Sequence, residues 1–201
     1  MDLLRFSVTW DYRCPFARNV HEHLVRALDA GAPWEVTFLP FSLSQVHVPE
    51  GGTPVWEDPS KAKDLIALAA GVVVRDRYPE HFLAVHQALF AARHDEGLDL
   101  READVVRSVL GGAGAPGEQV MTEVGEGWAQ AEIRKSHEWA AGELAVFGVP
   151  TFIVDDQAVF VRLMNRPGTD AELARATIES TVALIVGRPE LNEFKHTTVA
   201  H

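Results

Sequence analysis

Near the start of the sequence, the spacing of the apolar residues changes from every second residue, as in a strand, to the spacing of a helix. Apolar and polar residues alternate from Leu4 to Trp10, a pattern typical of a strand. From Cys14 onward, apolar residues recur at helical spacing until Gly31, where the pattern ends. A second apolar run, residues 34–41, has the length of a strand. The order predicts a β-α-β unit with its cysteine at the strand-to-helix junction.

The middle of the sequence is mostly helical in pattern. Residues 42–58 form a connection rich in proline and glycine, and residues 60–145 have helical periodicity with a turn at residues 111–117. Asp99, with Glu102 three residues later, resembles a helix cap. We therefore expect a long helical segment after the β-α-β unit.

The last third of the sequence predicts a hairpin and one more helix. Two apolar runs flank residues 155–157, which is typical of a β-hairpin. Residues 169–172 fit a capping box that begins at Thr169 and predict a helix to about Val186. The fold class is therefore α/β, in which β-α-β and β-β-α halves are separated by helices.

Composition excludes several classes of partner and site. The formal net charge of −11 argues against nucleic acids and anionic membranes, because both are polyanions. A single cysteine allows no internal disulfide and no cysteine-based zinc site, and favours a reducing compartment. The N-terminus lacks the pattern of a signal peptide, and the longest apolar run, residues 65–74, is too short to span a bilayer. We expect a cytoplasmic protein without a targeting segment.

Cys14 is the candidate nucleophile. Its position at a helix N-terminus favours a thiolate, because unpaired N–H groups and the helix dipole stabilise negative charge there. Arg13 and Arg18 add positive charge, and Pro15 suits the first helical turn. These features predict an accessible thiol with a lowered pKa. The alternative is an inert core cysteine, since free cysteines are among the most buried residues.

The segment from Phe147 to Thr151 is the second candidate feature. Pro150 begins an apolar run, where a proline removes a donor from the strand ladder. A cis Val149–Pro150 bond at the start of the strand resolves this conflict. The alternative is an ordinary turn that precedes a strand.

Together these motifs resemble the DsbA-like branch of the thioredoxin superfamily. The resemblance rests on "CPFA" after the first strand, the long helical insertion, and "GVPT" before the hairpin. Residues 134–137 and the tail 193–197 resemble actinobacterial mycothiol-dependent, nitroreductase-type members. The resemblance implies a thioredoxin-like domain at residues 1–58 and 146–201, with a helical domain at residues 59–145 inserted into it.

The resemblance also implies roles for individual residues. Cys14 is the implied nucleophile, and Pro150 is the implied cis-proline facing it. No metal and no tightly bound cofactor is expected. The remaining residues are implied to bind the thiol or the substrate: Trp10, Pro15, Phe16, Val149, Thr151, Arg134 and His137. For Arg134 and His137 the alternative is a solvated helix face.

Ala17 departs from the family pattern. The active dithiol site of the family is Cys-x-x-Cys, and alanine at position 17 cannot resolve a mixed disulfide. The chemistry would then be monothiol, with mycothiol or glutathione as external thiol and a small-molecule or protein disulfide as substrate. Two alternatives stay open. One is an enzyme like the related kappa-class glutathione transferases and 2-hydroxychromene-2-carboxylate isomerases, acting on a small aromatic substrate. The other is a redox-inactive binding protein.

The nine histidines predict no metal site. His21 and His23 are two residues apart and point in different directions on a helix. His81 and His86 are five apart, a spacing poorly suited to joint coordination.

Overall fold

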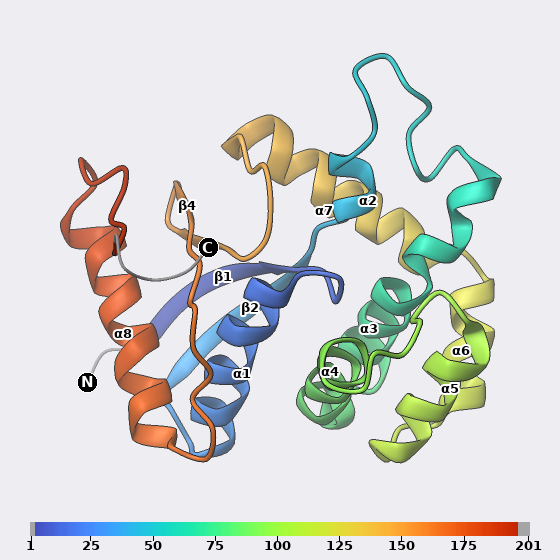
Figure 1. Ribbon diagram of the computed structural model, residues 1–201, viewed down its shortest axis with the longest axis horizontal. Helices are drawn as coiled ribbons and strands as arrows, with labels where there is room; N and C mark the ends of the chain where they lie inside the picture. The colour runs from blue at the N-terminus through green and yellow to red at the C-terminus, as the bar shows by residue number, and fades with distance from the viewer. Residues whose placement is uncertain (1–2, 197–201) are drawn as a thin grey trace.

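The computed structural model describes residues 3–196. Predictions that fall on residues 1–2 and 197–201, including Thr197 of the tail motif, lie outside the described residues. Within the described part, the chain follows the predicted order of a β-α-β half, a run of helices, and a β-β-α half (Figure 1).

Four strands form one sheet in the order β2-β1-β3-β4. β1 (Leu4–Trp10) pairs in parallel with β2 (Trp34–Pro40), so a crossover helix must connect them. β3 (Thr151–Val154) is antiparallel to β1 and forms the predicted hairpin with β4 (Gln157–Phe160). The register of β1 and β3 joins Ser7 to Ile153 and Val8 to Phe152. This short ladder brings the segment before β3 close to the end of β1.

The helices occupy the predicted segments, with one addition. A single turn, α2 (Leu43–Val46), lies in the connection at residues 42–58, for which no helix was predicted, and the hydroxyl of Ser42 caps it. The longer helices in chain order are α1 (Pro15–Asp29), η1 (Pro59–Leu65, a 3-10 helix), α3 (Ile66–Arg77), α4 (Pro79–His94), α5 (Ala103–Gly112), α6 (Gly117–Gly125), α7 (Trp128–Leu144) and α8 (Ala171–Gly187).

Two helix starts differ from the predicted caps. Helix α5 begins after Glu102 rather than near Asp99, because the Asp99 carboxylate accepts from the backbone and side chain of Arg101 instead. Helix α8 is capped by Asp170, whose carboxylate accepts from Leu173 N at 2.9 Å, so the prediction of Thr169 was wrong by one residue. Both errors arise where several capping residues compete within one turn.

Aromatic side chains join the sheet to the helices. Helices α1 and α8 lie beside each other, and α3 to α6 form a group on the opposite side of the molecule (Figure 1). Phe6 of β1 packs on Trp34 and Phe152 within the sheet. Trp10, at the end of the same strand, packs against Phe82 of α4. The buried core is therefore continuous from the sheet into the helical segment.

The helices η1 and α3 to α7 all lie between β2 and β3 in the sequence. The division into domains at residues 1–58, 59–145 and 146–201 stays a prediction. None of the described helices is long and apolar enough to cross a membrane.

Candidate active site

Cys14 is the N-cap residue of α1. Its sulfur accepts a hydrogen bond from Ala17 N at 3.4 Å, and its thiol donates to the carbonyl of Val149 at 3.2 Å. Cys14 N donates to Asp11 O at 3.1 Å, which closes the turn between β1 and α1. The thiol thus lies between the first turn of a helix and a carbonyl from the segment that precedes β3.

The prediction of an accessible thiol with a lowered pKa is wrong. Cys14 is only 7% exposed, and burial raises the pKa of its thiol above the ordinary value. The N–H groups of Ala17 and Phe16 and the charge of Arg162 lower this pKa, but by less than burial raises it. The sequence correctly indicated the helix terminus, but the covering by Val149 depends on a segment 135 residues away.

The raised pKa predicts how alkylation of Cys14 depends on pH. Iodoacetamide reacts with the thiolate, so its rate should still be rising at the ordinary thiol midpoint of about 8.5. The same chain unfolded in urea is the control and should show a midpoint near that ordinary value. A folded-state midpoint below that of the unfolded control would contradict the role assigned to burial.

The Val149–Pro150 bond is cis, as predicted. Pro150 is buried, and its carbonyl accepts from Val161 N at 3.1 Å, beyond the end of β4. The Val149 carbonyl faces the sulfur of Cys14, so the structure brings together the two motifs that the sequence singled out. The roles of Cys14 and Pro150 in a reaction remain a proposal.

Asp11 organises the turn that carries Cys14. Its carboxylate accepts from Arg13 N at 2.9 Å and from Leu43 N at 2.8 Å, at the start of α2. Burial raises the pKa of Asp11, although both backbone hydrogen bonds oppose this shift. Arg13 also donates to the Ser44 hydroxyl, so the turn before α1 is fastened to α2. No pattern in the sequence indicated this role of Asp11, because Leu43 and Ser44 lie about thirty residues further along the chain.

The exposed edge of the site is formed by Pro15, Phe16 and Arg162. Pro15 is exposed and Phe16 is half-buried. The guanidinium of Arg162, from the segment after β4, lies 4.8 Å from the centre of the Phe16 ring. Arg162 makes no ion pair among the described residues. It places a positive charge beside Cys14 that sequence reasoning missed, because the two residues are far apart in the chain.

Trp10 does not line this edge. Its side chain has no exposed surface and packs against Phe82 and His86, with the guanidinium of Arg75 5.7 Å from its ring centre. Residues of α3 and α4 cover the end of β1 at Trp10, and its role in binding a thiol or substrate stays a prediction. Val149 and Thr151 are also almost fully buried, and Thr151 turns its hydroxyl to Gly148 O at 2.8 Å.

Arg134 and His137 belong to a separate aromatic group. His137 stacks on Phe41 with ring centres 4.0 Å apart, and Arg134 lies over Trp56 at 5.7 Å. Arg134 is paired with Glu57 and Glu138, and burial lowers the pKa of His137 to about 4, so its ring is neutral at pH 7. Neither residue forms a hydrogen bond or ion pair with Cys14 among the described contacts, and their role in binding a thiol stays a prediction.

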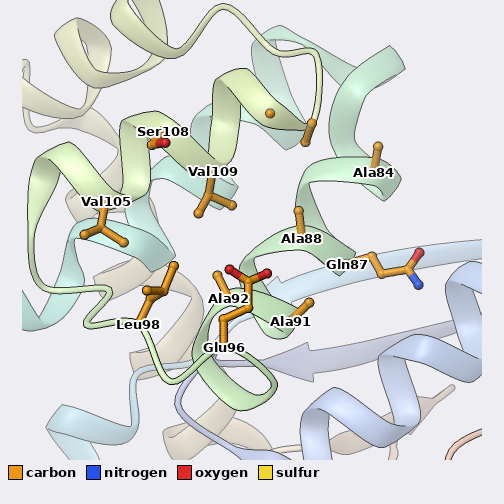
Figure 2. Close-up of a pocket in the computed structure, with 12 residues that line it drawn as sticks. Ala84, Gln87, Ala88, Ala91, Ala92, Glu96, Leu98, Val105, Ser108 and Val109 are labelled. Atoms are coloured by element: carbon orange, nitrogen blue, oxygen red, sulfur yellow. The ribbon is translucent and has the colours of Figure 1, made fainter.

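A cavity of about 680 Å³ lies between α4 and α5 (Figure 2). Alanines of α4, among them Ala88 and Ala91, face Val105 and Val109 of α5, while Glu96 and Gln87 supply polar groups. Neither Cys14 nor Pro150 lines it. Among residues 3–196, no group of three or more histidine, cysteine or acidic side chains is arranged to hold a metal ion.

Three further buried polar residues were missed by sequence reasoning. Thr9, His21 and His86 have no exposed surface and hydrogen-bond to one another or to the turns beside Cys14. The available signal was a histidine on the apolar face of each of two helices, near Val20 in α1 and Val85 in α4. Their partners lie in other elements, so the pattern alone could not join them.

The β-α-β and β-β-α halves share one mixed sheet, and the thiol at the β1–α1 junction faces a cis-proline turn, which is the arrangement of a thioredoxin-fold protein. A family model described as a DSBA-like thioredoxin domain matches residues 7–166. The chain belongs to this family, and the predicted fold class and family are confirmed. The comparison with curated proteins found no match.

Solved structures support the fold at low sequence identity. The cytosolic disulfide reductase DsbM from Pseudomonas aeruginosa, solved with GSH, has a TM-score of 0.61 and 14% identity, covering 90% of this chain and 100% of its own. DsbA of the same organism has a TM-score of 0.59 and 19% identity, covering 92% and 86%. A periplasmic thioredoxin-like protein from Salmonella enterica gives 0.53 and 20%, covering 90% and 84%.

Proposed function

We propose that the protein is a monothiol thiol-disulfide oxidoreductase in which Cys14 is the single nucleophile. The observation that carries this proposal is the position of the Cys14 sulfur, 3.4 Å from Ala17 N and 3.2 Å from the carbonyl of Val149. The N–H groups at the start of the helix can stabilise a thiolate. The Val149 carbonyl on the other side of the sulfur belongs to the turn at Pro150, where an extended substrate can pair with the backbone.

The reaction needs two exchanges. In the first, the Cys14 thiolate attacks one sulfur of a disulfide, forms a mixed disulfide, and releases the other sulfur as a thiolate. Ala17 offers no thiol for an internal second step, so the thiolate of an external thiol attacks the mixed disulfide. Cys14 is then released as a thiolate, and the external thiol leaves in a new disulfide. One external disulfide is thus exchanged for another, with no net oxidation of the protein.

Burial sets the expected speed of this chemistry. A raised pKa leaves little thiolate at neutral pH, although each thiolate is more nucleophilic when its pKa is higher. Exchange should therefore be slow at pH 7 and accelerate as pH rises. Substrate must also displace the covering contact with Val149, because only 7% of the Cys14 surface is exposed.

We further propose that the co-substrate is a low-molecular-weight thiol, glutathione or mycothiol, and that the protein acts in the cytoplasm. The similar DsbM was solved with GSH and is described as cytosolic, which supports both statements, while the similar protein from Salmonella enterica is described as periplasmic. The resemblance to actinobacterial members favours mycothiol. The positive charge of Arg162 beside Phe16 favours glutathione, which carries carboxylates. The disulfide substrate is a small molecule or a protein.

A second candidate is a redox-inactive binding protein of the same fold. The observation that favours it is the burial of Cys14 together with the raised pKa of its thiol. In this case the site beside Pro150 binds an extended partner without a covalent step.

Intact mass separates the two candidates. Wild-type protein incubated with oxidised glutathione, or with oxidised mycothiol, should gain one thiol adduct, and excess reduced thiol should release it. The Cys14→Ser variant is the control and should gain none. If wild-type protein stays unmodified while urea-unfolded protein reacts, the binding candidate is preferred. Saturable thiol binding that survives Cys14→Ser would instead support a noncovalent, transferase-type use of the thiol.

A further inference from the structure

A continuous chain of hydrogen bonds runs behind the site, through four fully or almost fully buried residues. The Tyr12 hydroxyl lies 2.9 Å from His86 Nδ1, and His86 Nε2 lies 2.9 Å from His21 Nδ1. His21 Nε2 lies 3.1 Å from the carbonyl oxygen of Thr9. These hydrogen bonds join β1, α1 and α4. The ring of Tyr12 packs against Phe90, and the ring of His21 packs against Phe38 and Phe90. None of the four is more than 1% exposed, so these hydrogen bonds are shielded from bulk solvent.

When both histidines are neutral, the hydrogen bonds of this network can run in only one donor-to-acceptor direction, from the Tyr12 hydroxyl to the Thr9 carbonyl. The Thr9 carbonyl can only accept, so His21 carries its proton on Nε2 and accepts at Nδ1. His86 must then donate from Nε2 and accept at Nδ1, which makes the Tyr12 hydroxyl the donor to His86. Burial lowers the pKa of both histidines, which keeps them neutral at pH 7. Every buried nitrogen of the two rings therefore has one partner of the correct kind.

The hydrogen-bond network ends at Tyr12 and Thr9. Tyr12 lies on the Cys14 side of the candidate site, and Thr9 lies on the Val149–Pro150 side. Tyr12 lies two residues before Cys14, and its carbonyl accepts from His94 Nε2 at 2.9 Å. At the other end, the Thr9 hydroxyl accepts from Thr151 N at 2.8 Å and lies 3.4 Å from Gly148 O, to which it donates. Gly148 and Thr151 flank Val149–Pro150, and the Val149 carbonyl accepts from the Cys14 thiol.

The side chain of Thr9 also continues the link between β1 and β3 beyond the last backbone pair of the sheet. The ladder between β1 and β3 ends at Val8 and Phe152, one residue short of Thr9 and Thr151. Beyond that point, only the hydroxyl of Thr9 fastens the Gly148–Thr151 turn to β1 among the described hydrogen bonds. A valine at position 9 would have the same shape but would leave Thr151 N without this partner.

We infer that Thr9, held by His21, is a positioning residue that sets the distance between the Cys14 sulfur and the Val149–Pro150 segment. The inference rests on the proposed function, in which this distance decides how a disulfide is presented to Cys14. A reacting geometry is sensitive to shifts of about 1 Å, so loss of one fastening at the turn should slow exchange. A small alkylating agent needs only the thiolate and no docking at the turn, so it should be affected much less.

Two matched variants test this role. Thr9→Val removes the hydroxyl and keeps the branched shape, whereas Thr9→Ser keeps the hydroxyl. We expect Thr9→Val to lower the rate of exchange with oxidised glutathione about tenfold relative to its iodoacetamide rate at the same pH, and Thr9→Ser to keep the wild-type ratio. A folded Thr9→Val variant with the wild-type ratio would overturn the inference. If Thr9→Val does not fold, Thr9→Ala removes the same hydroxyl with less apolar volume.

A spectroscopic readout separates this inference from the proposed function. Cys14 is the only cysteine, so the infrared S–H stretch of the protein reports its hydrogen bond to Val149 directly. In Thr9→Val the band should move toward the frequency of a free thiol, and in Thr9→Ser it should stay at the wild-type position. This result is expected even if wild-type Cys14 forms no adduct with any disulfide. An unchanged band in Thr9→Val would show that the turn keeps its place without the hydroxyl.

Discussion

Ala17→Cys is expected to give the protein a dithiol activity that the wild type lacks. Position 17 lies one helical turn after Cys14, and Ala17 N already lies 3.4 Å from the Cys14 sulfur. A thiol introduced there can attack the mixed disulfide at Cys14 and release the external thiol. We expect the variant to end as an internal disulfide without an adduct, and to reduce or oxidise disulfides in repeated turnover.

Controls for this variant follow from its surroundings. Ala17 has no exposed surface, so the larger side chain itself carries a packing cost of about 1–3 kcal/mol. Ala17→Ser has nearly the same size as the variant but no sulfur, and should behave like wild type. In Cys14→Ser/Ala17→Cys, the internal disulfide cannot form. A stable adduct on Ala17→Cys, equal to that of the wild type, would contradict the proposed geometry.

Gly71→Ala is expected to destabilise the fold by about 1–3 kcal/mol, although alanine is normally the better helix residue. A Cβ at position 71 of α3 would lie 2.4 Å from the Tyr12 hydroxyl oxygen and 3.0 Å from its ring. Tyr12 has little room to move, because it packs on Phe90 at 4.9 Å and is bonded to His86. The absence of a side chain at Gly71 is therefore what lets Tyr12 reach its partner.

Gly142→Ala is the matched control for this prediction. Gly142 lies near the end of α7, is exposed, and has no atom within 4 Å of an added Cβ. Its replacement should stabilise the helix by about 0.5–1 kcal/mol. Urea unfolding of both variants measures the difference. Equal gains in stability for Gly71→Ala and Gly142→Ala would mean that Tyr12 adapts freely, and that the hydrogen-bond chain behind it tolerates displacement.

Local patterns were sufficient to predict most of the fold. The alternation in β1, the helical period of α1 and the hairpin around Asp155 depend on neighbouring residues, and the structure confirms all three. The position of Cys14 at a helix N-terminus follows from the same patterns. Cap residues were less predictable, because Thr169 and Asp170 are both good caps and the structure uses Asp170.

The chemistry of the candidate site depends on contacts between distant segments, which is why part of it was mispredicted. Cys14 is buried by Val149, and its positive neighbour Arg162 comes from the segment after β4. The sequence suggested Arg18 for that role, but Arg18 is held in ion pairs with Glu22 and Asp95. Charge near a residue in the sequence is thus a weak guide to charge near its side chain.

In the proposed function, the folded protein rather than an unfolded minority presents Cys14 to disulfides. The rate of adduct formation with oxidised glutathione, measured at increasing urea concentrations below the unfolding transition, tests this. Reaction through the native site should be nearly independent of urea over this range, and much faster than global unfolding. A rate whose logarithm rises with urea along the slope of global unfolding would show that only unfolded protein reacts, and would identify Cys14 as a core cysteine.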